Sequence, residues 1–137
     1  MARILIADDD WDTRDILSRK FNAWNHTVMM ASNAADAVTL ACAEIPDLII
    51  LDSRMNLSAN EDVDDCAGLQ VAKCLKARAE TSSIPIIALT GHLLVKDLRR
   101  LMVSAGCVAF VEKPIMPITG YQEFRKIVEE VLAKRQA

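Results

Sequence analysis

The chain alternates short, nearly continuous apolar runs with stretches in which apolar residues recur at helical spacing. Runs of this kind are typical of strands that are buried on both faces of a parallel sheet. The pattern predicts five strands, at residues 3–7, 27–31, 48–51, 86–89 and 107–111. Because an amphipathic stretch follows each strand, we expect an α/β fold in which helices cover both faces of the sheet.

Several helix ends carry recognisable signals. Asn33 precedes a stripe of alanines at helical spacing, which predicts an N-cap. Either Asp10 or Asp12 is expected to cap the helix that follows the first strand. The fourth helix is expected over about residues 94–104, and Gly106 is its natural C-terminal stop.

Composition and charge narrow the class of protein. The 137 residues suit one domain, and 52% hydrophobic with 26% charged residues is an ordinary globular composition. A net charge of −3 argues against nucleic-acid binding, and the apolar runs are too short for a membrane span or a signal peptide. The four cysteines lack metal-ligand spacing and are interpreted as reduced thiols, so we expect a cytoplasmic protein.

Polar side chains follow several strands at the point where each strand ends. Right-handed crossovers bring the carboxyl ends of parallel strands to one edge of the sheet, where ligands bind. Carboxylates that meet there repel one another unless a cation joins them, and oxygen ligands suit Mg²⁺. Each residue alone is more often a cap or a turn, but together they indicate a phosphoryl-binding site. They are Asp8, Asp9, Asp10, Asp52, Thr90, Glu112, Lys113 and Pro114.

These positions, with the apolar runs before them, resemble the signature of response-regulator receiver domains of two-component signalling. The matching segments are ILIA before Asp8 and Asp9, PDLIIL before Asp52, IPIIAL before Thr90, and the pair Lys113-Pro114. The resemblance covers nearly the whole chain and implies a flavodoxin-like (βα)5 fold with strand order 2-1-3-4-5. We expect residues 1–137 to form a single receiver domain with no output domain in this chain. The sequence leaves open whether this domain stands alone or belongs to a longer protein.

The resemblance implies how the acidic residues would act. Asp52 would accept a phosphoryl group from a phosphohistidine of a histidine kinase or a phosphotransfer protein. Asp9 would bind Mg²⁺ directly, and Asp8 would hold it mainly through water. Asp52 itself and the backbone carbonyl of Arg54 would complete the protein's set of metal ligands.

The resemblance also assigns the remaining positions. Thr90 would donate a hydrogen bond to one phosphoryl oxygen, and Lys113 would pair with another. Phe110 stands at the family's switch position, and the peptide bond before Pro114 would be cis. Phosphorylation would then change a surface formed by the fourth helix, the fifth strand and the last helix, to which a downstream protein binds. Such a domain would be a monomer or a weak dimer, and it would not be an enzyme.

The connection after Asp52 departs from the family's pattern. Asn56 stands where the family usually has proline, and Gly68 comes later than the family's glycine. Residues 56–67 therefore form a long connection with four acids, Glu61, Asp62, Asp64 and Asp65. We expect a mobile, solvated lid that adds a negative field beside the site.

Two other classes of protein share parts of the pattern. A flavin-binding module would need hydroxyls, glycines and amides after the first strand, where three aspartates would repel its phosphate. An aspartate-nucleophile phosphohydrolase has the pattern D-x-D-x-[TV] there, but Asp12 stands in place of Thr or Val and a cap domain is missing. The phosphohydrolase remains the alternative function, and turnover of a generic phosphate ester distinguishes it from a receiver.

Overall fold

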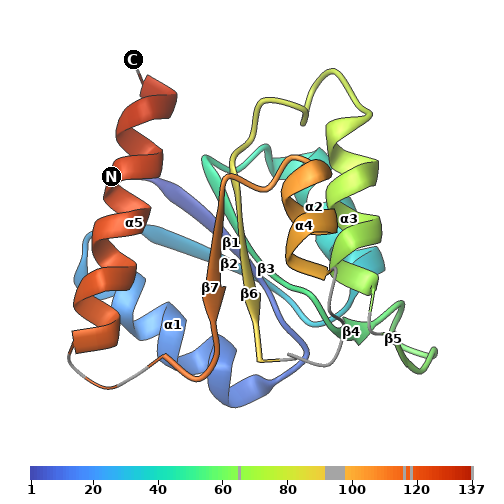
Figure 1. The fold of residues 1–137 in the computed structure, drawn as a ribbon, viewed down its shortest axis with the longest axis horizontal. Helices are drawn as coiled ribbons and strands as arrows, with labels where there is room; N and C mark the ends of the chain where they lie inside the picture. Colours follow the sequence, from blue (N-terminus) through green and yellow to red (C-terminus); the bar gives the residue numbers. More distant parts are fainter. Residues whose placement is uncertain (65, 92–97, 116, 118, 137) are drawn as a thin grey trace.

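The computed structural model describes the chain except for residues 65, 92–97, 116, 118 and 137. Its centre is a parallel sheet whose strands lie in the order β2-β1-β3-β6-β7 (Figure 1). The strands are β1 (Arg3–Ala7), β2 (Thr27–Ala31), β3 (Leu48–Asp52), β6 (Ile86–Thr90) and β7 (Ala109–Glu112). Since β6 and β7 are the fourth and fifth strands of this sheet, the order 2-1-3-4-5 and the doubly wound fold are confirmed.

Helices cover both faces of the sheet (Figure 1). Helices α1 (Trp11–Ala23) and α5 (Thr119–Gln136) lie on one face, and α2, α3 and α4 lie on the other. The bounds of these three are Ala34–Glu44, Ala67–Lys76 and Leu98–Ser104. The expected start of the fourth helix, near residue 94, lies outside the described residues. In the described part of the chain, no helix combines the length and the apolar character needed to cross a membrane.

Two helix starts have the caps that the sequence predicted. Asp10 caps α1, because its carboxylate accepts hydrogen bonds from the N–H of Asp12 at 3.3 Å and from the hydroxyl of Thr13 at 2.7 Å. Asn33 caps α2, where its side-chain oxygen accepts a hydrogen bond from the N–H of Asp36 at 2.8 Å. Each cap satisfies an N–H group that has no partner within its helix. The carboxylate of Asp10 therefore stabilises the start of α1.

The alternation of side chains along the strands divides the core in two. On β3, Ile49 and Leu51 pack with the residues of α2, α3 and α4, whereas Leu48 and Ile50 pack with those of α1 and α5. All five residues of β3 are buried, as expected of a central parallel strand. Strand β7 begins at Ala109, slightly later than predicted, because the preceding residues make the turn out of α4.

The long acidic connection contains a small antiparallel hairpin, which the sequence did not predict. Its strands are β4 (Met55–Asn56) and β5 (Val63–Asp64). The side chain of Met55 is fully buried in the core, and the carbonyl of Leu57 accepts a hydrogen bond from the N–H of Ala35 at 2.8 Å. The hairpin is therefore tied both to the core and to the first turn of α2. Asp65 lies outside the described residues.

Gly68, the glycine that comes later than the family's pattern, lies beside the end of β3. The N–H of Gly68 donates a hydrogen bond to the carbonyl of Ser53 at 3.1 Å. A Cβ atom at Gly68 would lie 2.3 Å from the carbonyl oxygen of Asp52 and 2.8 Å from the Cα of Ser53. Helix α3 can therefore approach the end of β3 this closely only when residue 68 has no side chain.

We expect Gly68→Ala to lower the free energy of unfolding by about 1–3 kcal/mol, because the added methyl group overlaps backbone atoms that must shift. Gly91→Ala is the matched control, since its Cβ would come no closer than 3.4 Å, to Lys113. This control should change stability by less than about 0.5 kcal/mol. Urea denaturation measures both variants, and equal losses of stability would contradict the packing argument.

Candidate functional site

Three carboxylates meet at the carboxyl edge of the sheet. Asp8 and Asp9 follow β1, and Asp52 is the last residue of the neighbouring strand β3. Each offers one carboxylate oxygen, and these oxygens all lie within 4.8 Å of one another. Asp8 and Asp52 are buried, while Asp9 is exposed. The sequence-based expectation that these three side chains converge agrees with their positions.

Lys113 provides a positive charge to this cluster from the end of β7. Its Nζ lies 2.9 Å from Oδ2 of Asp8 and 3.4 Å from Oδ2 of Asp52. Burial alone would lower the pKa of Lys113, but the charges of Asp52 and Asp8 raise it overall. The lysine therefore stays protonated at the site. The Lys113–Pro114 peptide bond is cis, the isomer that the resemblance implied.

The cluster holds more negative charge than one lysine neutralises. Burial and the charge of Asp8 raise the pKa of Asp52 to about 7, although Lys113 opposes the shift. Burial and Asp8 also raise the pKa of Asp9. Carboxylates whose charges are this unfavourable in the protein alone are stabilised by a bound cation. An all-oxygen donor set with a partly exposed member therefore fits Mg²⁺.

A cavity of about 210 Å³ opens beside the carboxylates and is lined by Asp9, Asp52, Arg54, Gly91 and Lys113. The backbone of Arg54 turns next to the carboxylate of Asp52, since its N–H lies 3.4 Å from Oδ1. The cavity gives an incoming group access to the buried carboxylate of Asp52. Glu112 is exposed and does not line it.

Thr90 and Phe110 lie on the other face of the sheet from the carboxylate of Asp52. The hydroxyl of Thr90 is buried and accepts a hydrogen bond from the hydroxyl of Ser53 at 2.6 Å. Phe110 is half-buried against the core under α2, α3 and α4, and the guanidinium of Arg99 lies 5.4 Å from the centre of its ring. Sequence reasoning missed Ser53, because only the register of β3 against β6 places it level with Thr90.

Comparison with known proteins identifies the family. The model of the response regulator receiver domain matches residues 4–125 of the chain. The chain belongs to this family. It is 29% identical over 112 residues to the polar-differentiation response regulator DivK of Brucella anthropi. The aligned region covers 82% of this chain and 84% of that protein.

Solved structures share the fold of this receiver domain. One is the receiver domain of the sensor histidine kinase PA1611 of Pseudomonas aeruginosa, which has a magnesium ion coordinated in its active site cleft. It matches with a TM-score of 0.78 and 21% identity over 96% of this chain and 98% of that chain. NtrX of Brucella abortus matches with a TM-score of 0.80 and 22% identity, over 98% of this chain but 28% of that longer one.

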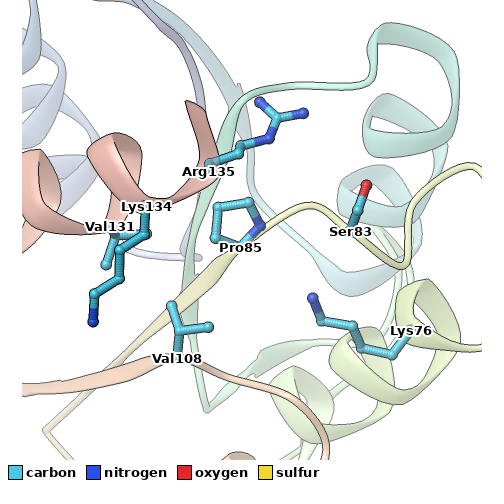
Figure 2. Close-up of a pocket in the computed structure, with 7 residues that line it drawn as sticks. All are labelled: Lys76, Ser83, Pro85, Val108, Val131, Lys134 and Arg135. Atoms are coloured by element: carbon cyan, nitrogen blue, oxygen red, sulfur yellow. The ribbon is translucent and has the colours of Figure 1, made fainter. Parts of the chain in front are cut away.

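A second cavity, of about 430 Å³, lies at the opposite edge of the sheet, near the starts of β6 and β7 (Figure 2). Its lining residues are Lys76, Ser83, Pro85, Val108, Val131, Lys134 and Arg135. Here Nζ of Lys76 donates hydrogen bonds to the carbonyls of Ser82 and Ile84, at 3.0 and 2.7 Å. The ammonium group of Lys76 is therefore held by backbone carbonyls, and the three carboxylates that could share a metal ion lie at the other edge of the sheet.

The raised pKa of Asp52 gives the metal-free receiver domain a pH-dependent stability. The pKa rises from 3.8 in the unfolded chain to about 7 in the folded protein. Between about pH 4 and pH 7 the folded state therefore binds a proton that the unfolded state has lost, so stability falls as pH rises. We expect Asp52→Asn to raise the free energy of unfolding by about 1–3 kcal/mol near pH 8 and by much less near pH 4.5.

Urea denaturation in EDTA at both pH values measures this difference. Glu123→Gln, which removes an exposed carboxylate on α5, is the control and should have little effect at either pH. An effect of Asp52→Asn that is the same at the two pH values would show that the charge of Asp52 is not the cause.

Proposed function

We propose that this receiver domain accepts a phosphoryl group on Asp52 from a phosphohistidine of a histidine kinase or a phosphotransfer protein. The observation that carries the proposal is the buried Asp52 carboxylate, which lies 3.4 Å from Lys113 and within reach of Asp8 and Asp9. In this proposal residues 1–137 act as a single receiver domain in the cytoplasm, where its four free cysteines remain reduced.

The transfer forms one bond and breaks another. An oxygen of the ionised Asp52 carboxylate attacks phosphorus, and the P–N bond to the donor imidazole breaks with its electron pair left on nitrogen. Because the pKa of Asp52 is about 7 in the protein alone, the carboxyl group must lose its proton before it can attack. The ammonium group of Lys113 offsets negative charge on the phosphoryl oxygens.

The same cluster would hold Mg²⁺. Asp9, Asp8 and Asp52 provide carboxylate oxygens, and the backbone carbonyl of Arg54 is the further ligand in this proposal. When bound, Mg²⁺ supplies positive charge that offsets the charge of the carboxylates and of the phosphoryl group. The magnesium ion in the active site cleft of the PA1611 receiver domain supports the assignment by likeness of fold.

The phosphoryl group would be read out through the opposite face of the sheet. Thr90 moves toward the phosphoryl oxygens and donates a hydrogen bond, and Phe110 then turns inward beside α4. The face formed by α4, β7 and α5 binds a downstream protein, as the exposed side chains of Leu101 and Val103 on α4 suggest. A partner that binds one of the two states more tightly shifts the equilibrium toward it.

With Mg²⁺ and acetyl phosphate, the wild-type protein should gain one phosphoryl group and Asp52→Asn should gain none, because the amide is a poor nucleophile. Asp9→Asn should be phosphorylated far more slowly, since it removes one of few metal ligands. Asp12→Asn is the matched control, because it removes an exposed acid of the first turn of α1 that lies outside the cluster.

Intact-mass spectrometry measures the adduct in each protein. A phosphoryl adduct that persists in Asp52→Asn would refute the assignment of the acceptor. Multiple turnovers of a generic phosphate ester by the wild type would favour the phosphohydrolase instead.

The acids of the hairpin should slow the approach of an anionic donor. The double substitution Glu61→Gln and Asp62→Asn removes two exposed charges, and we expect it to speed phosphorylation by acetyl phosphate and to weaken Mg²⁺ binding. Each effect should stay below about tenfold, because exposed charges interact by about 1 kcal/mol or less. High salt should remove both effects.

The matched control is Glu123→Gln with Glu130→Gln, which changes the net charge equally on α5. Phosphorylation rates at low and high salt compare the two double variants. If they behave alike, net charge and not the position of the hairpin acids sets the rate.

A further inference from the structure

The hydroxyls of Ser53 and Thr90 meet because of the register between two strands. Asp52 pairs with Leu89 across β3 and β6, so the next residues, Ser53 and Thr90, stand side by side. The N–H of Ser53 also donates a hydrogen bond to the carbonyl of Leu89 at 3.2 Å, which extends this pairing past the end of β3. The contact is therefore fixed by the backbone.

The pleat of the sheet directs this pair away from the acceptor carboxylate. Ser53 continues the series of Ile49 and Leu51, which pack under α2, α3 and α4. Thr90 continues the series of Ile86 and Ala88 on the same face. The carboxylate of Asp52 belongs to the alternate series, and the cavity beside it is lined by neither Ser53 nor Thr90. The Thr90 hydroxyl must therefore leave its present position to reach a phosphoryl group on Asp52.

The hydrogen bond between the two hydroxyls is short and shielded from solvent. The Oγ of Ser53 donates to the Oγ1 of Thr90 at 2.6 Å, and the two residues are 0% and 1% exposed. Among the described residues, Thr90 is the hydrogen-bond partner of the Ser53 hydroxyl. If Thr90 moves, a fully buried hydroxyl loses its partner where water does not replace it, and such a loss is costly.

We propose that Ser53 is a positioning residue that latches the Thr90 hydroxyl in the resting state and so opposes capture of the phosphoryl group. The proposal rests on the proposed phosphorylation of Asp52 and adds a residue that sets its equilibrium. Ser53 does not touch the phosphoryl group and acts through Thr90. The latch makes the receiver domain harder to switch on than the acceptor, the lysine and the metal ligands alone would make it.

Beryllofluoride, a phosphoryl mimic, tests the latch without a partner protein. With Mg²⁺ at a fixed concentration, Ser53→Ala should bind beryllofluoride about three- to tenfold more tightly than the wild type, because the hydrogen bond from Ser53 no longer has to break when Thr90 moves. Fluorine NMR of the bound mimic gives the dissociation constants. A merely structural role of Ser53 would weaken binding or leave it unchanged.

Thr81→Val is the matched control, because the Thr81 hydroxyl also makes a buried hydrogen bond of 2.6 Å, to the carbonyl of Leu75 far along the chain from the site. It should lower stability without changing the affinity for beryllofluoride. In a Thr90→Ala background, Ser53→Ala should no longer change the affinity, since the partner hydroxyl is already absent.

The outcomes separate the latch from the proposed function. If the wild type binds beryllofluoride and Ser53→Ala binds it equally well or less tightly, the latch is wrong and the phosphoacceptor function stands. The same holds if the effect of Ser53→Ala persists in Thr90→Ala. If the wild type does not bind beryllofluoride with Mg²⁺, the proposed function and the latch are both rejected.

Discussion

The burial of a carboxylate at the end of the central strand is the constraint on which the rest of the structure depends. Asp52 ends β3, whose five residues are all buried, and it lies against a second buried acid, Asp8. Two such charges are tolerated only with compensation, because desolvation and mutual repulsion both favour the neutral form. Lys113 supplies part of this compensation from β7, and the raised pKa of Asp52 shows that part of the cost remains. The residual cost makes the site receptive to a cation, and it ties the position of β7 to the chemistry of β3.

Because side chains alternate between the two faces of a pleated sheet, the acceptor site and the residues of the proposed switch lie on opposite faces. Asp52 and Lys113 approach the cavity from one face, whereas Ser53, Thr90 and Phe110 lie on the face covered by α2, α3 and α4. The proposed switch requires a side chain that crosses the edge of the sheet, and Thr90 at the end of β6 is placed to do so. In that proposal, the hydrogen bond from Ser53 acts directly on the residue that moves. Small changes at this edge are therefore expected to alter the switch without altering the fold.

Much of this arrangement follows from the sequence, and the remainder depends on the register between neighbouring strands. The buried strands and the caps at Asp10 and Asn33 follow from local patterns, because each depends on residues close together in the chain. The clustering of Asp8, Asp9 and Asp52 follows from the parallel topology, which brings the carboxyl ends of the strands to one edge of the sheet. The strand order came from the resemblance to receiver domains, since local patterns do not determine which strands are neighbours. The sequence does not predict the hairpin, because a strand of two residues is too short to show an alternation of apolar and polar residues. Met55 therefore gives no sign of a strand in the sequence. The contact of Ser53 with Thr90 joins residues that are far apart in the sequence and becomes visible only once β3 and β6 are aligned.

The departures from the family's pattern also find a common physical explanation. The extra residues after Arg54 leave and rejoin the end of β3 at two fixed points, the buried side chain of Met55 and the close approach of Gly68. Between these points the chain pairs with itself as β4 and β5, and the carbonyl of Leu57 accepts a hydrogen bond from Ala35 of α2, so these backbone groups place no demand on the acceptor strand. The glycine comes late in the sequence because the hairpin intervenes, but in space it lies directly against Asp52 and Ser53. An insertion bounded in this way can lengthen and acidify the rim of the site while the geometry of the acceptor is kept, because the sheet and not the loop determines where the carboxylates lie.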